Sequence, residues 1–201
     1  LFGIELMSNF KFPYFSRNIA EFWKRWHISL SSWFRDYVYI PLGGSRKGRY
    51  TSIKNVFIIF IVSGFWHGAN WTFIAWGFVH GIFYIPFFIY GKTKKISNIV
   101  AEDTFFPSIK EAFQMILTFF SVMVAWTFFR SESIYEALKY LEILFFEFSV
   151  PDQFLRGIIF VAILIVIDWT IRYDERNPLS YKKRINFLFY KSSNLFRYIV
   201  Y

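Results

Sequence analysis

The chain contains no cysteine among its 201 residues. Disulfide bonds, thiolate catalysis and cysteine-based zinc sites are therefore excluded. Acidic residues are also scarce, since 14 Asp and Glu face 23 Lys and Arg and leave a formal net charge of +9. That charge invites a nucleic-acid-binding interpretation. We reject it, because the basic residues fall in short clusters between apolar runs, a pattern typical of the cytoplasmic loops of membrane proteins.

Charge is absent altogether from two long stretches. Residues 55–91 hold no Asp, Glu, Lys or Arg over 37 positions, and residues 112–129 hold none over 18. About 20 apolar residues make one membrane crossing. A straight helix over 55–91 would reach roughly 55 Å, which exceeds a hydrocarbon core of about 30 Å. We therefore expect this stretch to fold back as two short spans. Its natural break is Gly68-Ala69-Asn70, because Gly and Asn tolerate turn geometry.

The remaining segments complete an all-α prediction. Residues 16–40 mix aromatic with basic side chains and are expected to form interfacial helices, the first capped by Asn18. Residues 133–149 are expected to form an amphipathic helix that begins with a capping box between Ser133 and Glu136. The predicted fold is a multi-pass transmembrane helical protein with one membrane domain over 1–201. Its spans are expected at 55–91 (two short ones), 112–129 and 154–172.

The distribution of charge predicts the topology of these four spans. Basic residues gather in 45–54, 92–95 and 172–191, whereas 130–152 hold five acids against two bases. Four crossings place the three basic segments on the cytoplasmic side and the acidic one outside, as the positive-inside rule expects. The chain starts without an initiator Met and without a signal-peptide pattern. We therefore expect it to be a fragment of a longer membrane protein.

His67 is the leading candidate for chemistry. It adjoins the expected helix break inside the first uncharged stretch, and ionisable residues at membrane depth are expensive and often functional. An imidazole there is expected to be uncharged, because burial disfavours the charged form. An uncharged imidazole can accept a proton from an alcohol. The alternative is a polar residue that bonds two helices together.

His80 is expected to have a packing or hydrogen-bonding role. On a continuous helix it would lie roughly 220° around and 20 Å along from His67, so the two would not share a site. The surrounding patterns Gly64-x-x-x-Gly68 and Gly77-x-x-x-Gly81 are typical of closely packed helices.

His27 lies in a segment of aromatic and basic residues beside Trp26. It either faces water at the interface or joins His67 as a second active-site histidine. Three histidines without an HxxxH pair or a nearby trio of acids do not indicate zinc, so no metal site is predicted.

Other motifs are weaker. Ser63 lacks the first glycine of a G-x-S-x-G nucleophile turn, and no P-loop or G-x-G-x-x-G occurs. Arg35, Arg46, Lys47 and Arg49 either hold the phosphates of a donor at the cytoplasmic face or contact anionic lipid.

Several motifs occur in an order that resembles one family. They are Phe22-Trp23-Lys24-Arg25-Trp26-His27-Ile28-Ser29-Leu30, Trp33-Phe34-Arg35-Asp36-Tyr37, Ile40-Pro41-Leu42-Gly43-Gly44, Trp66-His67-Gly68-Ala69-Asn70-Trp71, Trp76-Gly77 and His80-Gly81. The chain resembles the membrane-bound O-acyltransferases, and within them the bacterial alginate O-acetyltransferase branch. The resemblance is concentrated in residues 20–81 and extends more weakly through residues 125–130 toward the C-terminal region.

This resemblance implies the C-terminal part of a larger multi-pass enzyme. It would move an acetyl group from a thioester donor toward hydroxyls of a cell-surface or exported polysaccharide. The resemblance implies that His67 is the key histidine and that His27 occupies a second polar position of the active site. We further expect substrate-binding roles for Trp66, Asn70, Trp71, Arg35 and Asp36.

The resemblance also implies the setting of the reaction. The donor would be acetyl-CoA or another acyl thioester, with no tightly bound cofactor. The expected partners are membrane lipids, a polysaccharide acceptor and an extracytoplasmic protein that completes transfer. The expected location is the bacterial inner membrane. One rival is D-alanyl transfer for teichoic acid modification, although residues 41–48 favour the polysaccharide branch. The other rival is a non-catalytic transporter or scaffold subunit whose histidines are structural.

Overall fold

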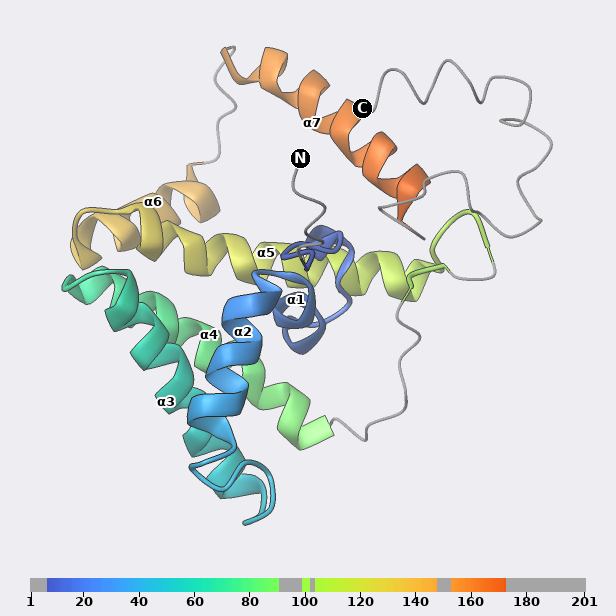
Figure 1. The fold of residues 1–201 in the computed structure, drawn as a ribbon. Coiled ribbons are helices and arrows are strands. Elements are labelled where there is room, and N and C mark those ends of the chain that lie inside the picture. Colours follow the sequence, from blue (N-terminus) through green and yellow to red (C-terminus); the bar gives the residue numbers. More distant parts are fainter. Residues whose placement is uncertain (1–6, 91–98, 102–103, 148–152, 173–201) are drawn as a thin grey trace, which may run out of the picture. The chain divides into compact units, whose positions relative to one another are not determined.

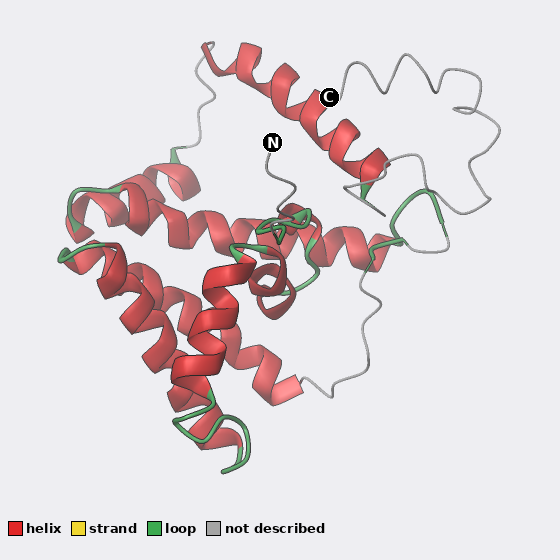
Figure 2. Ribbon diagram, viewed as in Figure 1, coloured by secondary structure: helices red, strands yellow, loops and turns green. Residues whose placement is uncertain are grey.

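The computed structural model describes residues 7–90, 99–101, 104–147 and 153–172. Within these residues all regular secondary structure is helical (Figure 2). The chain divides into two compact units, 1–149 and 150–201. The first contains every element named here except α7, which belongs to the second. In chain order the elements are η1 (Pro13–Phe15), α1 (Ile19–Arg25), α2 (Ile28–Phe34), η2 (Arg35–Tyr39), α3 (Arg49–His67), α4 (Trp71–Tyr90), α5 (Ile109–Arg130), α6 (Ile134–Phe146) and α7 (Gln153–Ile171).

Helices α3 and α4 pack side by side as an antiparallel pair (Figure 1). Helix α3 ends at His67 and α4 begins at Trp71, so the chain turns at the break that the sequence predicts. A methyl group added to Gly64 or to Gly77 would collide with a backbone carbonyl of the opposite helix. The glycine patterns therefore allow the two backbones to touch, which confirms the predicted close packing.

Two described helices are long and apolar enough to cross a membrane by length and composition, Trp71–Ile89 and Ile109–Arg130. An apolar segment of α7, Gly157–Ile171, is shorter. Helix α3 does not belong to this set. Its first six residues include two basic ones, Arg49 and Lys54. Crossing by α3 and by α7 stays a prediction. The basic segments 92–95 and 173–191 lie outside the described residues.

Helix α1 packs against α4 and α5 and is held there by both apolar and charged contacts. Asn18 caps it as predicted, with its side-chain oxygen accepting from the backbone N–H of Glu21 at 2.8 Å. Ile19 and Phe22 of α1 form a buried cluster with Val122 of α5. This arrangement carries the aromatic residues at the end of α1 toward the middle of the first unit.

Two helix caps differ from the expectation. Ser133 accepts from the backbone N–H of Glu136 at 3.2 Å, but the Glu136 carboxylate accepts from Glu132 rather than from Ser133. The predicted capping box is therefore wrong in one of its two hydrogen bonds, because the Glu136 carboxylate binds the backbone N–H of Glu132 instead of that of Ser133. A full capping box occurs instead between Ser108 and Glu111 at the start of α5, where the sequence analysis predicted none.

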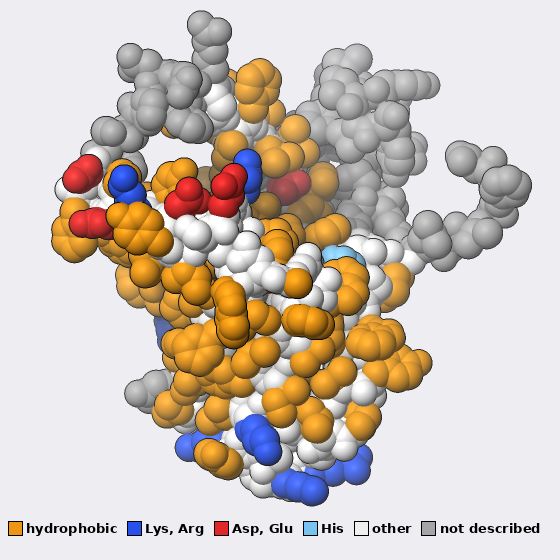
Figure 3. Space-filling view, turned by 90° about the vertical axis from the view of Figure 1, so that its left-hand side faces the viewer, with side chains coloured by type: hydrophobic (Ala, Val, Ile, Leu, Met, Phe, Trp, Pro, Cys, Tyr) orange, Lys and Arg blue, Asp and Glu red, His pale blue; other side chains and the backbone are white. Residues whose placement is uncertain are grey.

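One face of the molecule has apolar side chains over its middle and charged side chains toward its ends (Figure 3). Figure 3 shows hydrophobic side chains over the middle of one face, with Lys and Arg gathered at its lower end. The exposed Arg46, Lys47 and Arg49 precede or begin α3, whereas His67 ends it. At 1.5 Å per residue, the helix separates its basic start from His67 by about 27 Å.

Candidate active site

His67 is placed by the end of α3 and by an aromatic surround. Its ring meets Trp66, Trp76 and Phe129 edge to face, with ring centroids 4.9, 5.3 and 5.0 Å away. The helix stops here because Gly68 follows with an extended backbone. The imidazole is half-buried and is held at a fixed angle by three large rings.

His27 lies where α1 gives way to α2, in a left-handed backbone conformation with φ 45°. Residues other than glycine rarely adopt it, and such strain clusters at functional sites. Asn9 holds the turn, since its carbonyl accepts from Ile28 N at 2.9 Å and its side chain accepts from Ser29 N at 3.0 Å. The His27 Nδ1 atom is buried and has no hydrogen-bond partner in the described part of the chain.

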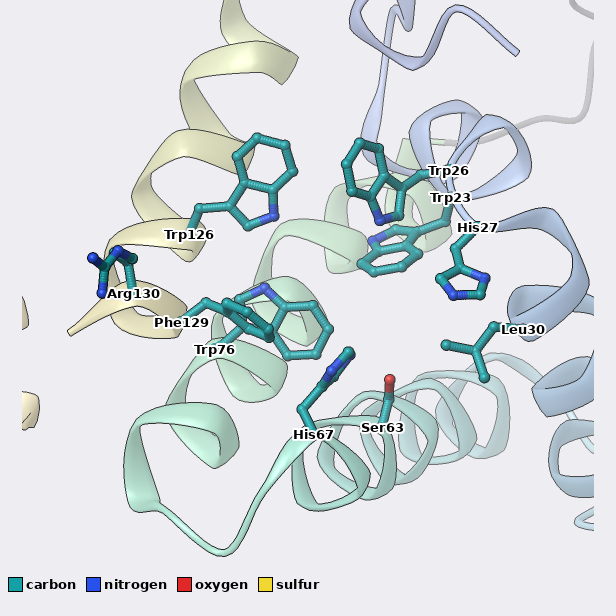
Figure 4. A pocket seen from close by; sticks show the side chains of 10 residues that line it. All are labelled: Trp23, Trp26, His27, Leu30, Ser63, His67, Trp76, Trp126, Phe129 and Arg130. Carbon is teal, nitrogen blue, oxygen red and sulfur yellow. The ribbon is translucent and has the colours of Figure 1, made fainter. Parts of the chain in front are cut away.

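The two histidines line one cavity of about 410 Å³. Figure 4 shows both rings pointing into the space between them and the surrounding aromatic side chains. Helices α1, α2, α3, α4 and α5 all contribute to the wall. The lining residues are Trp23, Trp26, His27, Leu30, Ser63, His67, Trp76, Trp126, Phe129 and Arg130.

The chemistry of this lining is mostly apolar. Four tryptophans and a phenylalanine form much of the wall, and Arg130, which is exposed, is the charged side chain among these ten residues. An uncharged imidazole in such surroundings can accept a proton from a hydroxyl group. Among the described residues, no three His, Cys, Asp or Glu side chains lie close enough together to hold a metal ion.

A network of ion pairs holds α1 beside the cavity. The Glu21 carboxylate pairs with Arg17 at 2.9 Å and with Arg25 at 2.6 Å, and Arg17 reaches across to Glu111 of α5 at 3.1 Å. Burial raises the pKa of Glu21, but hydrogen bonds from Arg17 and the charge of Arg25 outweigh this and hold the pKa below its ordinary value. The network therefore favours the ionised carboxylate and fixes the helix that carries Trp23 and Trp26.

His80 does not line the cavity and is fully buried. Its Nδ1 accepts a hydrogen bond from Trp23 Nε1 at 3.4 Å, and its ring stacks on Phe60 with centroids 5.6 Å apart. This agrees with the packing and hydrogen-bonding role expected for it. Through Trp23, His80 also helps to hold the cavity wall.

The other predicted site residues lie away from the lining. Trp66 and Trp71 are exposed by 61% and 74% and flank the turn next to His67. Asn70 accepts from Thr72 N and donates to the carbonyl of Glu132, both at 3.1 Å, so it links two turns. Arg35 and Asp36 form an exposed ion pair at 2.7 Å. The structure brings His27 and His67 together on the cavity, whereas these five residues are not part of its lining. Of the five, Trp66 contacts the His67 ring, with ring centroids 4.9 Å apart.

Sequence reasoning assigned no role to most of the wall. Trp23, Trp26 and Trp76 lie within motifs that carry the resemblance, so an indication was available for them. Trp126 and Phe129 belong to an uncharged run whose composition fits any apolar helix. Only the packing of α5 against α1 and α4 brings them to the histidines.

Comparison with the sequences of known proteins shows the family of this chain. A model of the membrane-bound O-acyltransferase family matches residues 1–123. The chain is 42% identical over 139 residues to the probable alginate O-acetylase AlgI of Pseudomonas putida, which covers 69% of this chain and 26% of that protein. It is also 40% identical over 141 residues to the peptidoglycan O-acetyltransferase of Helicobacter pylori. That match covers 70% of this chain and 25% of the Helicobacter protein.

A further relative is the teichoic acid D-alanyltransferase of Streptococcus thermophilus, 36% identical over 141 residues, with 64% of this chain and 34% of that protein covered. The chain thus spans about a quarter to a third of the length of these relatives. The motifs around His27 and His67 fall inside the residues that the family model matches. Since that match takes in more than half of the sequence, the chain belongs to the membrane-bound O-acyltransferase family.

Proposed function

We propose that this chain carries the acyl-transfer centre of a membrane O-acetyltransferase. The enzyme moves an acetyl group from a thioester donor toward hydroxyls of a cell-surface or exported polysaccharide. The observation that carries the proposal is the placement of His27 and His67 on one cavity, in a chain of the membrane-bound O-acyltransferase family. Relatives named as alginate and peptidoglycan O-acetylating enzymes support the acetyl group and the polysaccharide acceptor.

In this proposal His67 accepts the proton of the acceptor hydroxyl or orients that hydroxyl against the thioester carbonyl. His27 assists from the other side of the cavity. The aromatic wall keeps water away, and its Trp76 and Phe129 rings hold the His67 imidazole in place, so that donor and acceptor meet in a reactive geometry. Positioning of this kind supplies much of the rate of a two-substrate reaction. No tightly bound cofactor takes part, and acetyl-CoA or another acyl thioester serves as donor.

The charge distribution supports an orientation for the enzyme. The basic residues at the start of α3 belong on the cytoplasmic side by the positive-inside rule. His67 lies about 27 Å away at the other end of that helix, and so belongs nearer the opposite face. We infer a multi-pass protein of the bacterial inner membrane, surrounded by lipid. It would take its donor from the cytoplasm and act with an extracytoplasmic partner protein that completes transfer to the polymer.

The exposed residues predicted for substrate binding have places in this proposal. Trp66 and Trp71 flank the turn beside His67 and leave most of their surface open. Broad, open aromatic surfaces there would suit an acceptor that approaches from outside. Arg35 and Asp36 are on η2, toward the basic start of α3 in the chain, where donor binding is expected.

D-alanyl transfer to teichoic acid is the second candidate. A relative with that name, 36% identical to this chain, favours keeping it. The two functions differ in their donor. A complete protein that takes its acyl group from a small carrier protein and ignores acetyl thioesters would support D-alanyl transfer. The opposite preference would support O-acetylation.

The proposal is tested by the O-acetyl content of the cell-surface polysaccharide in cells that make the complete protein with His67→Ala. Membrane abundance is measured in parallel. We expect acetyl groups to be lost while abundance stays normal. Unchanged acetylation at normal abundance would remove His67 from the mechanism and favour a structural histidine in a transporter or scaffold subunit.

A further inference from the structure

The indole N–H of Trp76 is buried beside His67 without a hydrogen-bond partner. Trp76 is exposed by only 3%, and its Nε1 atom meets no acceptor among the described residues. Buried tryptophans usually place this N–H on a partner. Leaving a buried donor unsatisfied is unfavourable, because its hydrogen bond to water is lost and not replaced. A group left in this state in a native structure calls for an explanation, and one explanation is a bond formed only with a substrate.

The ring that carries this N–H has little freedom to move. It meets the rings of His67, His80 and Phe129 with centroids 5.3, 5.0 and 5.5 Å apart. The next residue, Gly77, lies against the backbone carbonyl of Phe60 on α3. Because His67 is also on α3, this contact fixes the position of Trp76 relative to His67. The N–H group of Trp76 is therefore held in place before any ligand arrives.

A neighbouring indole shows the contrast. Trp23 also lines the cavity, but its Nε1 donates to Nδ1 of His80. Trp76 lines the same cavity with its own Nε1 unused. Figure 4 shows the Trp76 indole between His67 and Trp126, at the wall that His67 faces. The cavity wall thus carries the His67 imidazole and an indole with an unused N–H, and the centroids of the two rings are 5.3 Å apart.

We propose that Trp76 Nε1–H donates a hydrogen bond to the carbonyl oxygen of the acyl group during transfer, which rests on the acyl-transfer function proposed above. The acceptor hydroxyl oxygen forms a bond to the thioester carbonyl carbon and gives its proton to the His67 imidazole. The C=O π pair moves onto the oxygen that faces Trp76. When that pair returns, the C–S bond breaks and the leaving thiolate takes the proton from His67.

The hydrogen bond from Trp76 Nε1–H has its largest effect when the carbonyl oxygen carries most negative charge. A hydrogen bond to an ionised oxygen is roughly twice as strong as a bond between neutral groups. In a cavity with mostly apolar walls, the difference between the ground state and the intermediate is larger than in water. Removing one such donor typically lowers kcat by about 10²- to 10³-fold. Trp76 is therefore a catalytic residue in this proposal, and its loss should affect kcat rather than KM.

The experiment separates the N–H from the bulk of the ring. Benzothienylalanine keeps the shape of tryptophan and replaces N–H with sulfur. It is introduced at position 76 of the purified complete protein, beside Trp76→Phe and wild type. Acetyl transfer from an acetyl thioester to a polysaccharide oligomer is followed, and kcat and KM are determined separately. Trp33→Phe is the matched control, because Trp33 is exposed and lies away from the cavity.

We expect benzothienylalanine to lower kcat by about 10²-fold with KM little changed, and Trp33→Phe to behave as wild type. Wild-type kcat with benzothienylalanine would overturn the proposal, since only the shape of the ring would then matter. That result would leave acetyl transfer by the wild type intact. A wild-type protein without acetyl transfer would instead overturn the proposed function itself.

Discussion

Gly77 of α4 lies directly against the backbone carbonyl of Phe60 of α3. Gly64 and Phe73 repeat this contact in the reverse sense, with the glycine on α3 and the carbonyl on α4. The two contacts hold the helix pair that carries His67 and Trp76. The geometry of the cavity thus depends on residues that have no side chain and do not line it.

Gly77→Ala is expected to destabilise the protein by about 1–3 kcal/mol, because the added methyl group forces two tightly packed backbones apart. The check is the melting temperature of the purified protein in detergent. Gly157→Ala on α7 is the matched control, since among the described residues the added methyl group meets nothing within 4 Å beyond its own stretch of helix. That variant should be neutral or slightly stabilised, because alanine favours a helix by about 0.5–1 kcal/mol over glycine. Equal melting temperatures for Gly77→Ala and wild type would contradict the close packing.

Glu21→Gln is expected to destabilise the first unit by about 2 kcal/mol, because the partly buried Arg17 and Arg25 each lose the charge of the Glu21 carboxylate. The melting temperature measures this loss. Asp36→Asn is the control, since the Arg35–Asp36 pair is exposed and exposed pairs contribute little. A loss for Asp36→Asn as large as that for Glu21→Gln would contradict the importance given to burial.

The ion-pair network also predicts a dependence of stability on pH. The pKa of Glu21 is lowered in the folded state, so its contribution is present above the unfolded pKa, about 4.3. The contribution is lost as pH falls through the lower folded pKa. The difference in melting temperature between wild type and Glu21→Gln should therefore shrink as pH falls from about 6 to about 3. A constant or growing difference would show that Glu21 acts without its charge.

Asn70 is expected to act on structure more than on substrate. Asn70→Ala removes the bonds to Thr72 N and to the Glu132 carbonyl and should cost about 1 kcal/mol or more. Asn70→Asp keeps the acceptor for Thr72 N and loses only the donor to Glu132, so its loss should be smaller. Melting temperature and KM are compared for both variants. Normal stability with a raised KM would instead indicate direct contact with substrate.

The prediction from sequence succeeded where local chemistry decides the outcome. The break at Gly68-Ala69-Asn70 and the close packing at Gly64 and Gly77 follow from residues that permit turns or contact. Asn18 likewise caps α1, because its side chain accepts a hydrogen bond from the backbone N–H of Glu21, three residues further along the chain. The capping box of Ser108 and Glu111 has the same Ser-x-x-Glu pattern and is equally predictable from sequence. The carboxylate of Glu136 shows the limit, because a flexible side chain can choose between two adjacent N–H groups.

The site itself depends on contacts between distant segments. No spacing in the sequence relates His27 to His67. Their meeting was one of two alternatives for His27, and the family resemblance favoured it. Their meeting depends on Asn9, which holds the left-handed turn at His27. The contribution of Trp126 depends on how α5 crosses the other helices. Such features arise from tertiary packing, which a pattern of residue types does not specify.

The proposed function requires His27 and His67 to act in one acyl-transfer site. The most direct measurement is the kcat/KM for acetyl transfer by the complete protein with His27→Ala, His67→Ala and both substitutions together. Each single variant should lose about 10²- to 10⁴-fold. The double variant should be no worse than the poorer single one, because residues that act as a unit are strongly non-additive. Losses that multiply in the double variant, or a wild-type rate for His67→Ala, would show that the two histidines do not act as one site.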